Sequence, residues 1–493
     1  MGELARTDGL RLPGRAIVDG AAVEPRATFD NVSPRDGGIL GQVARCGAAD
    51  VDRAVASARA AFEDGRWREQ PYRAKKQVLH KLADLIETHL EELATLESLD
   101  MGKPIADARA FDIPASANSF RYYAEALDKL YGEVGPHHPD RISWVVHEPL
   151  GVIGCIVPWN FPLNMAAWKV APALAMGNSV VLKPAEQSPM TAIRLGELAL
   201  EAGLPPGVLN VVPGYGEEAG QALGRHMDVD MLAFTGSGSV GGLLMRYAGK
   251  SNLKRVSLEL GGKSPQIVFA DCPDMEAAAQ AAAWGIFFNQ GEVCTAASRL
   301  LVENGIKAEF VARVVAIAKT IVPGDPLDPD TRFGAMVSEE QMTGVLRRIQ
   351  RAEADGAKLL LGGQRVREES GGFFVTPTVF DDVDPASALA QQEVFGPVLG
   401  AIGFDTTEEA FRLANQTVYG LAAGVWTADV TRAHRAARAI RSGLVWINGW
   451  DACDITMPFG GFRQSGFGRD RSMHALEKYA DLKAITITLG PQK

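Results

Sequence analysis

Cysteine is scarce in this chain of 493 residues, which contains only five. They are Cys46, Cys155, Cys272, Cys294 and Cys453. No two of them form a CxxC motif or a spacing typical of metal ligands, so the sequence predicts no disulfide framework and no metal site. Sparse, unpaired cysteines favour a reducing compartment, and we expect a cytoplasmic protein.

Excess positive charge and long hydrophobic runs are also missing. Lys and Arg number 50 against 60 Asp and Glu, a formal net charge of −10, which argues against nucleic acid or an anionic membrane as the main partner. The longest apolar stretch, residues 151–182, is interrupted by Pro158, Asn160, Pro162 and Lys169, so it cannot form a membrane span. Residues 1–18 contain arginines without a following apolar segment, which predicts no signal peptide.

The chain does contain a regular alternation of strand and helix patterns. Short apolar runs predict strands at 152–157, 179–183, 208–212, 231–234 and 256–260, with helices between them. Ser188 and Pro189 predict the start of one of these helices, and Gly203 its end. An earlier helix is expected from about Asp50. Strands and helices that alternate in this way indicate a parallel, doubly wound sheet.

The pattern restarts after about residue 262 and predicts a second α/β unit. We expect strands at 267–269, 300–302 and 445–448 and an alanine-rich helix over 275–288. A further helix begins at Ser338, where Gln341 completes a capping box.

Two segments look like strands outside these units. Residues 132–149 are polar and proline-rich at first and then alternate at Ile142, Trp144 and Val146, which predicts a hairpin that stands off the main body. The tail, residues 483–489, alternates again. It could pair with the hairpin of another subunit, which would protect both edges.

A glycine-rich turn and one cysteine are the first candidates for chemistry. Residues 234–241 contain G-x-G-x-x-G between a strand and a helix, a pattern that favours phosphate binding, although the same glycines can serve turn geometry alone. Glu259 follows Gly241 by eighteen residues, close to the usual spacing of a ribose ligand. Cys294 follows a glycine-interrupted helix end and could be a nucleophile or a buried inert thiol; the other four cysteines are interpreted as inert.

Seven motifs then occur in order along the chain. They are Pro158-Trp159-Asn160-Phe161-Pro162, Lys183-Pro184-Ala185-Glu186, Phe234-Thr235-Gly236-Ser237, Glu259-Leu260-Gly261-Gly262-Lys263, Gly291-Glu292-Val293-Cys294, Glu393-Val394-Phe395-Gly396-Pro397 and Pro458-Phe459-Gly460-Gly461. The ordered set resembles the NAD(P)-dependent aldehyde dehydrogenase superfamily. Residues 468–479 look most similar to enzymes that oxidise γ-glutamyl-γ-aminobutyraldehyde and related aminoaldehydes.

The resemblance implies an α/β fold with a Rossmann-type cofactor domain, a second α/β catalytic domain and a small β oligomerisation hairpin. The expected boundaries are 1–130 with 150–260 for the NAD-binding domain, 261–470 for the catalytic domain, and 131–149 with 475–493 for the oligomerisation strands. It further implies a homo-oligomer, expected to be a dimer of dimers.

The resemblance also implies catalytic roles. Cys294 attacks the aldehyde carbon and forms a thiohemiacetal, whose oxyanion Asn160 and the Cys294 backbone N–H stabilise. After hydride transfer leaves a thioester, Glu259 activates water as general base; this role is favoured over the ribose interpretation. Lys169 and Asp470 would pass the proton to solvent, although many relatives have Glu at the position of Asp470. Glu292 replaces a commoner Gln and is expected to point away from the thiol.

Cofactor and substrate residues follow from the same resemblance. Glu186 with Lys183 would bind the ribose, which favours NAD over NADP because a carboxylate repels a 2′-phosphate. The remaining cofactor candidates are Trp159, Gly236, Ser237, Gly241, Glu393 and Phe395. An aromatic funnel of Phe161, Trp168 and Phe459 would guide the aldehyde, although ordinary core packing is an alternative. Asp112, Asp107 and Asp454 could attract a substrate amine, or could be ordinary surface acids.

Several alternatives stay open. The substrate could instead be a general aliphatic aldehyde, a betaine aldehyde or a semialdehyde. A cysteine hydrolase could use Cys294 and Glu259 without a cofactor, but the glycine-rich turn and Glu186 argue against it. A catalytically silent structural or binding protein on this fold is disfavoured because Cys294, Glu259 and Asn160 are intact.

Overall fold

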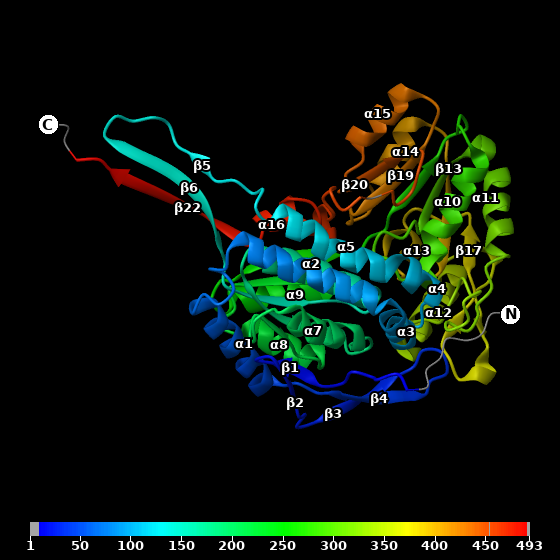
Figure 1. Ribbon diagram of the computed structural model, residues 1–493. Helices are drawn as coiled ribbons and strands as arrows, with labels where there is room; N and C mark the ends of the chain where they lie inside the picture. Colours follow the sequence, from blue (N-terminus) through cyan, green and yellow to red (C-terminus); the bar gives the residue numbers. More distant parts are fainter. Residues whose placement is uncertain (1–8, 453, 491–493) are drawn as a thin grey trace.

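A computed structural model describes residues 9–452 and 454–490. Two β-sheets form the centres of two α/β units, and a thin β-arm projects from the first (Figure 1). The first sheet has the strand order β2 (Ala21–Val23), β1 (Ala16–Val18), β9 (Leu209–Val211), β8 (Ser179–Lys183), β7 (Val152–Ile156), β10 (Met231–Gly236), β11 (Arg255–Leu260) and β21 (Gly466–Phe467).

The five central strands of this sheet run parallel, as the alternation predicted. In spatial order they are β9, β8, β7, β10 and β11. The chain lays down β7, β8 and β9 in one direction and then returns to add β10 and β11 on the other side of β7. This reversal creates a switch point between β7 and β10, where α/β sheets commonly bind ligands beyond the carboxyl ends of their strands. The doubly wound fold expected from the sequence is therefore confirmed.

Alternate residues of these strands enter different cores. Ile153 and Cys155 of β7 pack with the helices of one face, whereas Val152 and Ile156 pack with those of the other. The first face carries α2 (Tyr72–Thr88), α3 (Leu90–Met101), α5 (Ile113–Ala126), α6 (Pro162–Ala175) and α7 (Met190–Ala202). The opposite face carries α1 (Ala48–Glu63), α8 (Gln221–Arg225) and α9 (Gly238–Gly249). Two short helical segments, α4 (Ile105–Asp107) and a π-helix (Ala108–Asp112), precede α5.

The second sheet has the order β14 (Lys358–Leu361), β17 (Thr378–Asp381), β18 (Val398–Phe404), β13 (Arg299–Glu303), β12 (Pro265–Val268), β19 (Ala422–Trp426) and β20 (Leu444–Ile447). All neighbours except β14 and β17 are parallel. One face is covered by α10 (Met275–Phe287) and α11 (Asn304–Ala318), and the other by α12 (Glu339–Ala354), α14 (Thr407–Ala414) and α15 (Val430–Ala439).

Short elements complete the chain. They are the pair β3 (Thr28–Val32) and β4 (Ile39–Ala44), the pair β15 (Arg365–Val366) and β16 (Phe374–Val375), α13 (Ala388–Gln391) and α16 (His474–Glu477). Strand β21 lies beyond the second sheet in sequence but pairs with β11 of the first, so the chain returns to the first unit before its end.

Two predicted helix starts differ in detail from the structure. Pro189 is the N-cap of α7 and Asp100 accepts the hydrogen bond from the Met190 N–H at 2.7 Å, so Ser188 is not the cap. At α12, Ser338 caps as expected, but the Gln341 side chain donates to the Phe395 carbonyl at 2.6 Å and does not complete a capping box.

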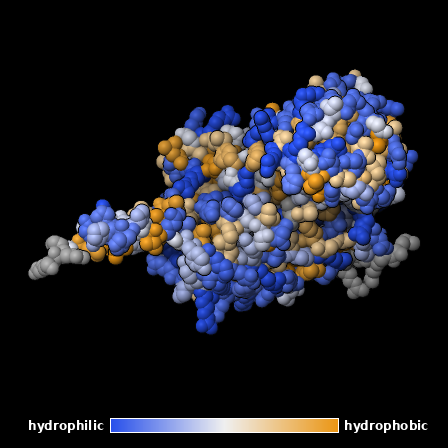
Figure 2. All heavy atoms as spheres, turned by 90° about the horizontal axis from the view of Figure 1, so that it is seen from above, coloured by the Kyte–Doolittle hydropathy of each residue, from blue (hydrophilic) through white to orange (hydrophobic). Residues whose placement is uncertain are grey.

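The projecting arm consists of β5 (Glu133–Val134), β6 (Arg141–Pro149) and β22 (Ala480–Thr488) (Figure 1). The tail strand β22 pairs antiparallel with β6 of the same chain over nine residues, which corrects the expectation that it pairs with another subunit's hairpin. Cross-strand neighbours such as Ile487 with Ile142 and Ile485 with Trp144 lie on one face of the arm. Hydrophobic residues are visible on the surface of this arm in Figure 2.

Candidate active site

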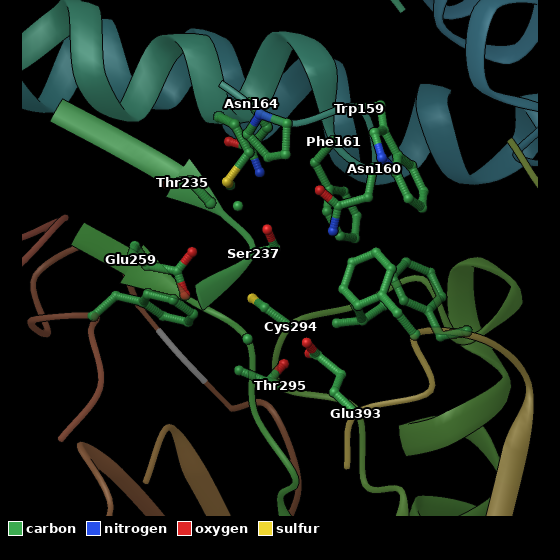
Figure 3. A pocket seen from close by; sticks show the side chains of 18 of the residues that line it. Trp159, Asn160, Phe161, Asn164, Thr235, Ser237, Glu259, Cys294, Thr295 and Glu393 are labelled. Carbon is green, nitrogen blue, oxygen red and sulfur yellow. The ribbon is translucent and has the colours of Figure 1, made fainter. Parts of the chain in front are cut away.

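A cavity of about 320 Å³ lies at the carboxyl ends of the first sheet's strands. Strand β10 contributes Thr235 and Gly236, β11 contributes Glu259, and the turn after β7 contributes Trp159. The second unit contributes Cys294 and its neighbours, so residues from both units face one space (Figure 3).

Cys294 lies in the turn between a short 3₁₀-helix, Phe288–Gly291, and β13. Three consecutive residues, Asn289, Gln290 and Gly291, have φ of 48°, 57° and 72°, which turns the chain sharply before the cysteine. A Cβ on Gly291 would lie 2.4 Å from the Gly396 carbonyl carbon, so only glycine fits there. The half-buried Cys294 sulfur points into the cavity (Figure 3).

Asn160 is held against the cysteine loop. Its side-chain Nδ2 donates to the Glu292 carbonyl at 2.9 Å, and the Asn289 side chain donates to the Asn160 carbonyl at 3.1 Å. One of the two amide protons of Asn160 therefore remains for another acceptor. The Glu292 carboxylate accepts the Val337 N–H at 3.2 Å, so it is directed away from the thiol, as expected.

Glu259 is 4% exposed and faces the cavity from the side of β11 (Figure 3). Burial raises the pKa of Glu259 to about 8, although the nearby Lys169 ammonium opposes the shift. Neither of its carboxyl oxygens has a hydrogen-bond partner in residues 9–452 and 454–490. Burial, followed by the charge of Glu259, also raises the pKa of Cys294 well above its ordinary value. The resting thiol is therefore neutral and needs a base to react.

Behind Glu259, the Asp470 carboxylate is bound by two ammonium groups, those of Lys169 and Lys478. Asp470 and Lys169 are almost fully buried. Burial alone would raise the pKa of Asp470, but the two lysines outweigh it and lower that pKa. The structure thus pairs Lys169 with Asp470, as the relay hypothesis requires, and adds Lys478, which the sequence did not indicate.

The glycine-rich turn lies at the start of α9. Ser237 is the N-cap, and its hydroxyl accepts the Val240 N–H at 3.4 Å. The residues from Ser237 to Val240 are exposed, whereas Gly241 is buried and a Cβ there would lie 2.9 Å from the Leu260 side chain. This helix start is open to a phosphate, because the first N–H groups of a helix have no partner within it.

Lys183, the last residue of β8, forms an ion pair with Glu186 at 2.9 Å. Glu186 is part of a neighbouring hollow that also includes Tyr215 and Ser338, and neither residue of the pair lines the main cavity. Trp159 does line it, and its carbonyl accepts the Ser188 hydroxyl at 3.2 Å.

Glu393 and Phe395 enter the cavity from the second unit. The Glu393 carboxylate accepts the Gly262 N–H at 3.0 Å, and burial raises its pKa to about 7. A Cβ on Gly261 would lie 1.9 Å from a Glu393 carboxylate oxygen. The Glu393 side chain can therefore occupy its place in the cavity only because residue 261 is glycine. The Phe395 ring meets the Trp159 ring edge-on at 5.2 Å between centroids.

The three aromatic residues predicted for the substrate funnel, Phe161, Trp168 and Phe459, all line the cavity. The Trp168 and Phe459 rings lie 4.9 Å apart. Two further rings were missed: Phe111 and Phe288 each pack about Phe161, with centroids 6.2 and 6.3 Å from its ring. Phe111 sits on the π-helix and Phe288 in the cysteine loop, where no hydrophobic periodicity marks them.

The acidic residues expected to attract an amine lie elsewhere. Asp112 is fully buried and paired with Lys103 at 2.9 Å, which corrects its assignment to the substrate pocket. Asp454 is exposed and accepts the Thr456 N–H at 2.8 Å; it does not line the cavity, and neither does Asp107. Cys453 lies outside the described residues.

Two charged residues that the sequence analysis did not select, Asp451 and Arg471, line the cavity instead.

Within the described residues, no cluster of three or more His, Cys, Asp or Glu side chains could hold a metal ion. Among the described residues, no helix has the length and apolar character needed to span a membrane.

A cysteine and an open helix start that face one cavity between two α/β units are consistent with a dehydrogenase that binds a dinucleotide. The chain belongs to the aldehyde dehydrogenase family, whose model matches residues 22–485, and it is an aldehyde dehydrogenase that oxidises aldehydes. The resemblance noted in the sequence is confirmed.

Individual relatives cover nearly the whole chain. The NADP/NAD-dependent aldehyde dehydrogenase PuuC of Escherichia coli K12 is 50% identical over 482 residues, 97% of each chain. The crystal structure of an indole-3-acetaldehyde dehydrogenase complexed with NAD+ has a TM-score of 0.97 at 54% identity, and covers 98% of each chain. A γ-glutamyl-γ-aminobutyraldehyde dehydrogenase from Burkholderia cenocepacia has a TM-score of 0.96 at 54% identity, also over 98% of each chain.

Proposed function

We propose that this enzyme oxidises an aminoaldehyde to a carboxylate with NAD, through a covalent intermediate on Cys294. The observation that carries the proposal is that the Cys294 sulfur, the Glu259 carboxyl and the candidate cofactor residues Ser237 and Glu393 face one cavity. NADP is the less favoured cofactor, because Glu186 would repel a 2′-phosphate.

The residues present fit a dinucleotide. The open helix start at Ser237 and Gly238 suits the pyrophosphate, and the Glu393 carboxylate can accept hydrogen bonds from a ribose. Glu186 and Lys183 would hold the other ribose. When bound, the nicotinamide supplies the hydride acceptor that no protein side chain can provide.

Cys294 would add to the aldehyde carbon. Glu259, whose charge is close enough to raise the pKa of Cys294, would accept the thiol proton. The new oxyanion would receive the remaining amide proton of Asn160 and the Cys294 N–H, for which no acceptor exists within the described part of the chain. Loss of one such donor typically lowers the rate roughly a hundred- to thousandfold.

Glu259 would then serve as general base for water that hydrolyses the thioester. Its carboxyl oxygens lack protein partners among the described residues and are free to bind that water. The proton could leave through Lys169 and Asp470, which are in contact just behind Glu259. Asp470 would serve this step in place of the Glu that many relatives have, although its side chain is one carbon shorter.

An aminoaldehyde is favoured by the aromatic funnel, by the acidic residue Asp451 at the cavity, and by the similar Burkholderia enzyme named for γ-glutamyl-γ-aminobutyraldehyde. The cysteine hydrolase alternative is disfavoured because it leaves the helix start and Glu393 without a ligand.

The test is a panel of aldehydes assayed by NADH absorbance with the parent enzyme and with Cys294→Ala. We expect the variant to lose at least about a thousandfold in turnover, because Cys294 is the only thiol among the described residues that lines the cavity, and to retain NAD affinity in a fluorescence titration. Cys155→Ala is the control, since that thiol is fully buried. Aldehyde turnover that needs Cys294 but no dinucleotide would contradict the proposal.

We also propose a cytoplasmic homo-oligomer, a dimer of dimers, that assembles through the arm. The four described cysteines are free, which supports a reducing compartment. Ile142 and Ile487 are each about half exposed on one face of the arm, as an unpaired apolar surface that a second copy could cover.

A further inference from the structure

Arg471 is a charged residue of the cavity that the proposed chemistry does not use, and Asp451 lines the same cavity. No ion pair within the described residues involves either of them. The Nε of Arg471 is buried and has no hydrogen-bond partner in the described part of the chain. Arg471 as a whole is half-buried, but a buried N–H without an acceptor, such as its Nε–H, is costly unless a ligand supplies an acceptor.

The Arg471 guanidinium is fixed against the aromatic funnel. It lies 4.4 Å from the centroid of the Trp168 ring and 5.6 Å from that of Phe459. A guanidinium that rests with its face on aromatic rings keeps its N–H edge free. That planar edge matches the two oxygens of a carboxylate.

The backbone holds both charges in place. Arg471 and Ser472 have φ of 57° and 52°, and Asp451 has φ of 54°, all left-handed conformations that non-glycine residues rarely adopt. The two loops are tied together, because the Ser472 N–H donates to the Ile455 carbonyl at 2.7 Å. Such strain persists where the surrounding structure fixes it, often at ligand sites.

Asp451 faces the same space and lies within electrostatic reach of both Arg471 and Cys294. A plain alkylammonium aldehyde would find Asp451 but would be repelled by the unpaired Arg471. An uncharged aldehyde would leave the buried Nε–H of Arg471 without an acceptor. A substrate end that carries one charge of each sign satisfies both.

We propose that the far end of the substrate is an α-amino-acid group, whose carboxylate binds the edge of Arg471 and whose ammonium binds Asp451. This proposal rests on the proposed function, because it places the aldehyde carbon of the same molecule at Cys294. Arg471 and Asp451 are then specificity-determining residues, and the substrates are ω-aldehydes that end in an amino acid.

The test compares γ-glutamyl-γ-aminobutyraldehyde with N-pentanoyl-4-aminobutanal, which keeps the amide and the chain length but carries no charge. With Arg471→Met we expect KM for the charged aldehyde to rise about tenfold or more, because a bidentate charged contact is lost, while KM for the uncharged aldehyde changes less than about threefold. Asp451→Asn should raise KM for the charged aldehyde by a smaller factor.

Arg225→Met is the matched control, because Arg225 also stacks on an aromatic ring, that of Tyr247 at 4.6 Å, but does not line the cavity. An equal rise in KM for both aldehydes in Arg471→Met would show that Arg471 only holds the aromatic side chains in place, and it would overturn the inference. So would a parent enzyme that does not prefer the charged aldehyde. Absence of NADH formation with either aldehyde would instead refute the proposed function.

Discussion

At the scale of single residues, the chemistry depends on how burial changes the acidity of two groups. Glu259 and Cys294 face each other across a partly closed cavity, and burial favours the neutral form of each. Glu259 can therefore take a proton near neutral pH, which an exposed carboxylate does poorly.

Replacement of Glu259 by Gln is expected to trap the thioester. The amide keeps the shape of the side chain but cannot accept a proton. Thiol attack should therefore slow, but hydrolysis should slow more, by about a hundred- to ten-thousandfold, because water is a far weaker acid than a thiol. Intact-protein mass spectrometry after addition of NAD and aldehyde should show the acyl group on Cys294. If Glu259→Gln instead abolished NAD affinity, the ribose interpretation of Glu259 would be revived.

The hydrolysis rate should also depend on pH. Because the pKa of Glu259 is raised to about 8, the fraction of the active carboxylate increases with pH and levels off above that value. Below pH 8 the hydrolysis rate should rise by about tenfold per pH unit. Single-turnover measurement of thioester decay between pH 6 and 9 would check this, and a decay rate that falls as pH rises would contradict it.

Sequence patterns identified the reactive residues but not their environment. The motifs selected Cys294, Glu259 and Asn160, and the structure brings all three to one cavity region. The burial of Asp112 against Lys103 could not be predicted, because an acidic residue near a helix start has the same local pattern whether it faces solvent or a lysine distant in space. The position of Arg471 depends likewise on a left-handed backbone that no local propensity indicates.

At the scale of elements, the periodicity of apolar residues was sufficient to predict the strands of the central sheets. Strands β7, β8 and β11 lie within a residue or two of their expected ranges. For β7 and β8 the reason is that every residue is buried, so the sequence of each is largely apolar. The start of α7 was less predictable, since its cap comes from Asp100, far away in the sequence. The partner of β22 was missed for the same reason.

The loop between β11 and β12 offers a test at this scale. In Gly261→Ala the added methyl group would overlap the Glu393 carboxylate and displace it, so KM for NAD should rise by about tenfold while the fold is kept. Steady-state kinetics with NAD varied would measure it. The control is Gly242→Ala in α9, where a Cβ meets nothing within 4 Å and a stabilisation of about 0.5–1 kcal/mol is expected. An unchanged KM in Gly261→Ala would argue against a role of Glu393 in cofactor binding.

At the scale of the whole molecule, the arm exposes several large hydrophobic side chains that the single chain does not cover. Val134, Ile142 and Ile487 are more than half exposed, and the register of β22 on β6 aligns the two isoleucines. A lone apolar face on a thin sheet is unfavourable in water, which supports its burial against another copy.

Ile487→Lys should therefore weaken assembly. A charge placed in an apolar interface is costly to desolvate, so size-exclusion chromatography with light scattering should show a smaller species than for the parent enzyme. Thr486→Lys, on the opposite face of the same strand, is the control. An identical mass for the parent and Ile487→Lys would count against assembly through this face.

The arm begins close in sequence to the buried ion pairs of Asp470. Lys478, which holds Asp470, is separated by a single residue from the first residue of β22, and the carbonyl of that intervening Tyr479 accepts the Asn178 amide at 3.0 Å. The proposed subunit contact and the proposed proton relay are thus only two residues apart along the chain. If both proposals hold, a change at the carboxyl-terminal strand that weakens assembly should also lower turnover.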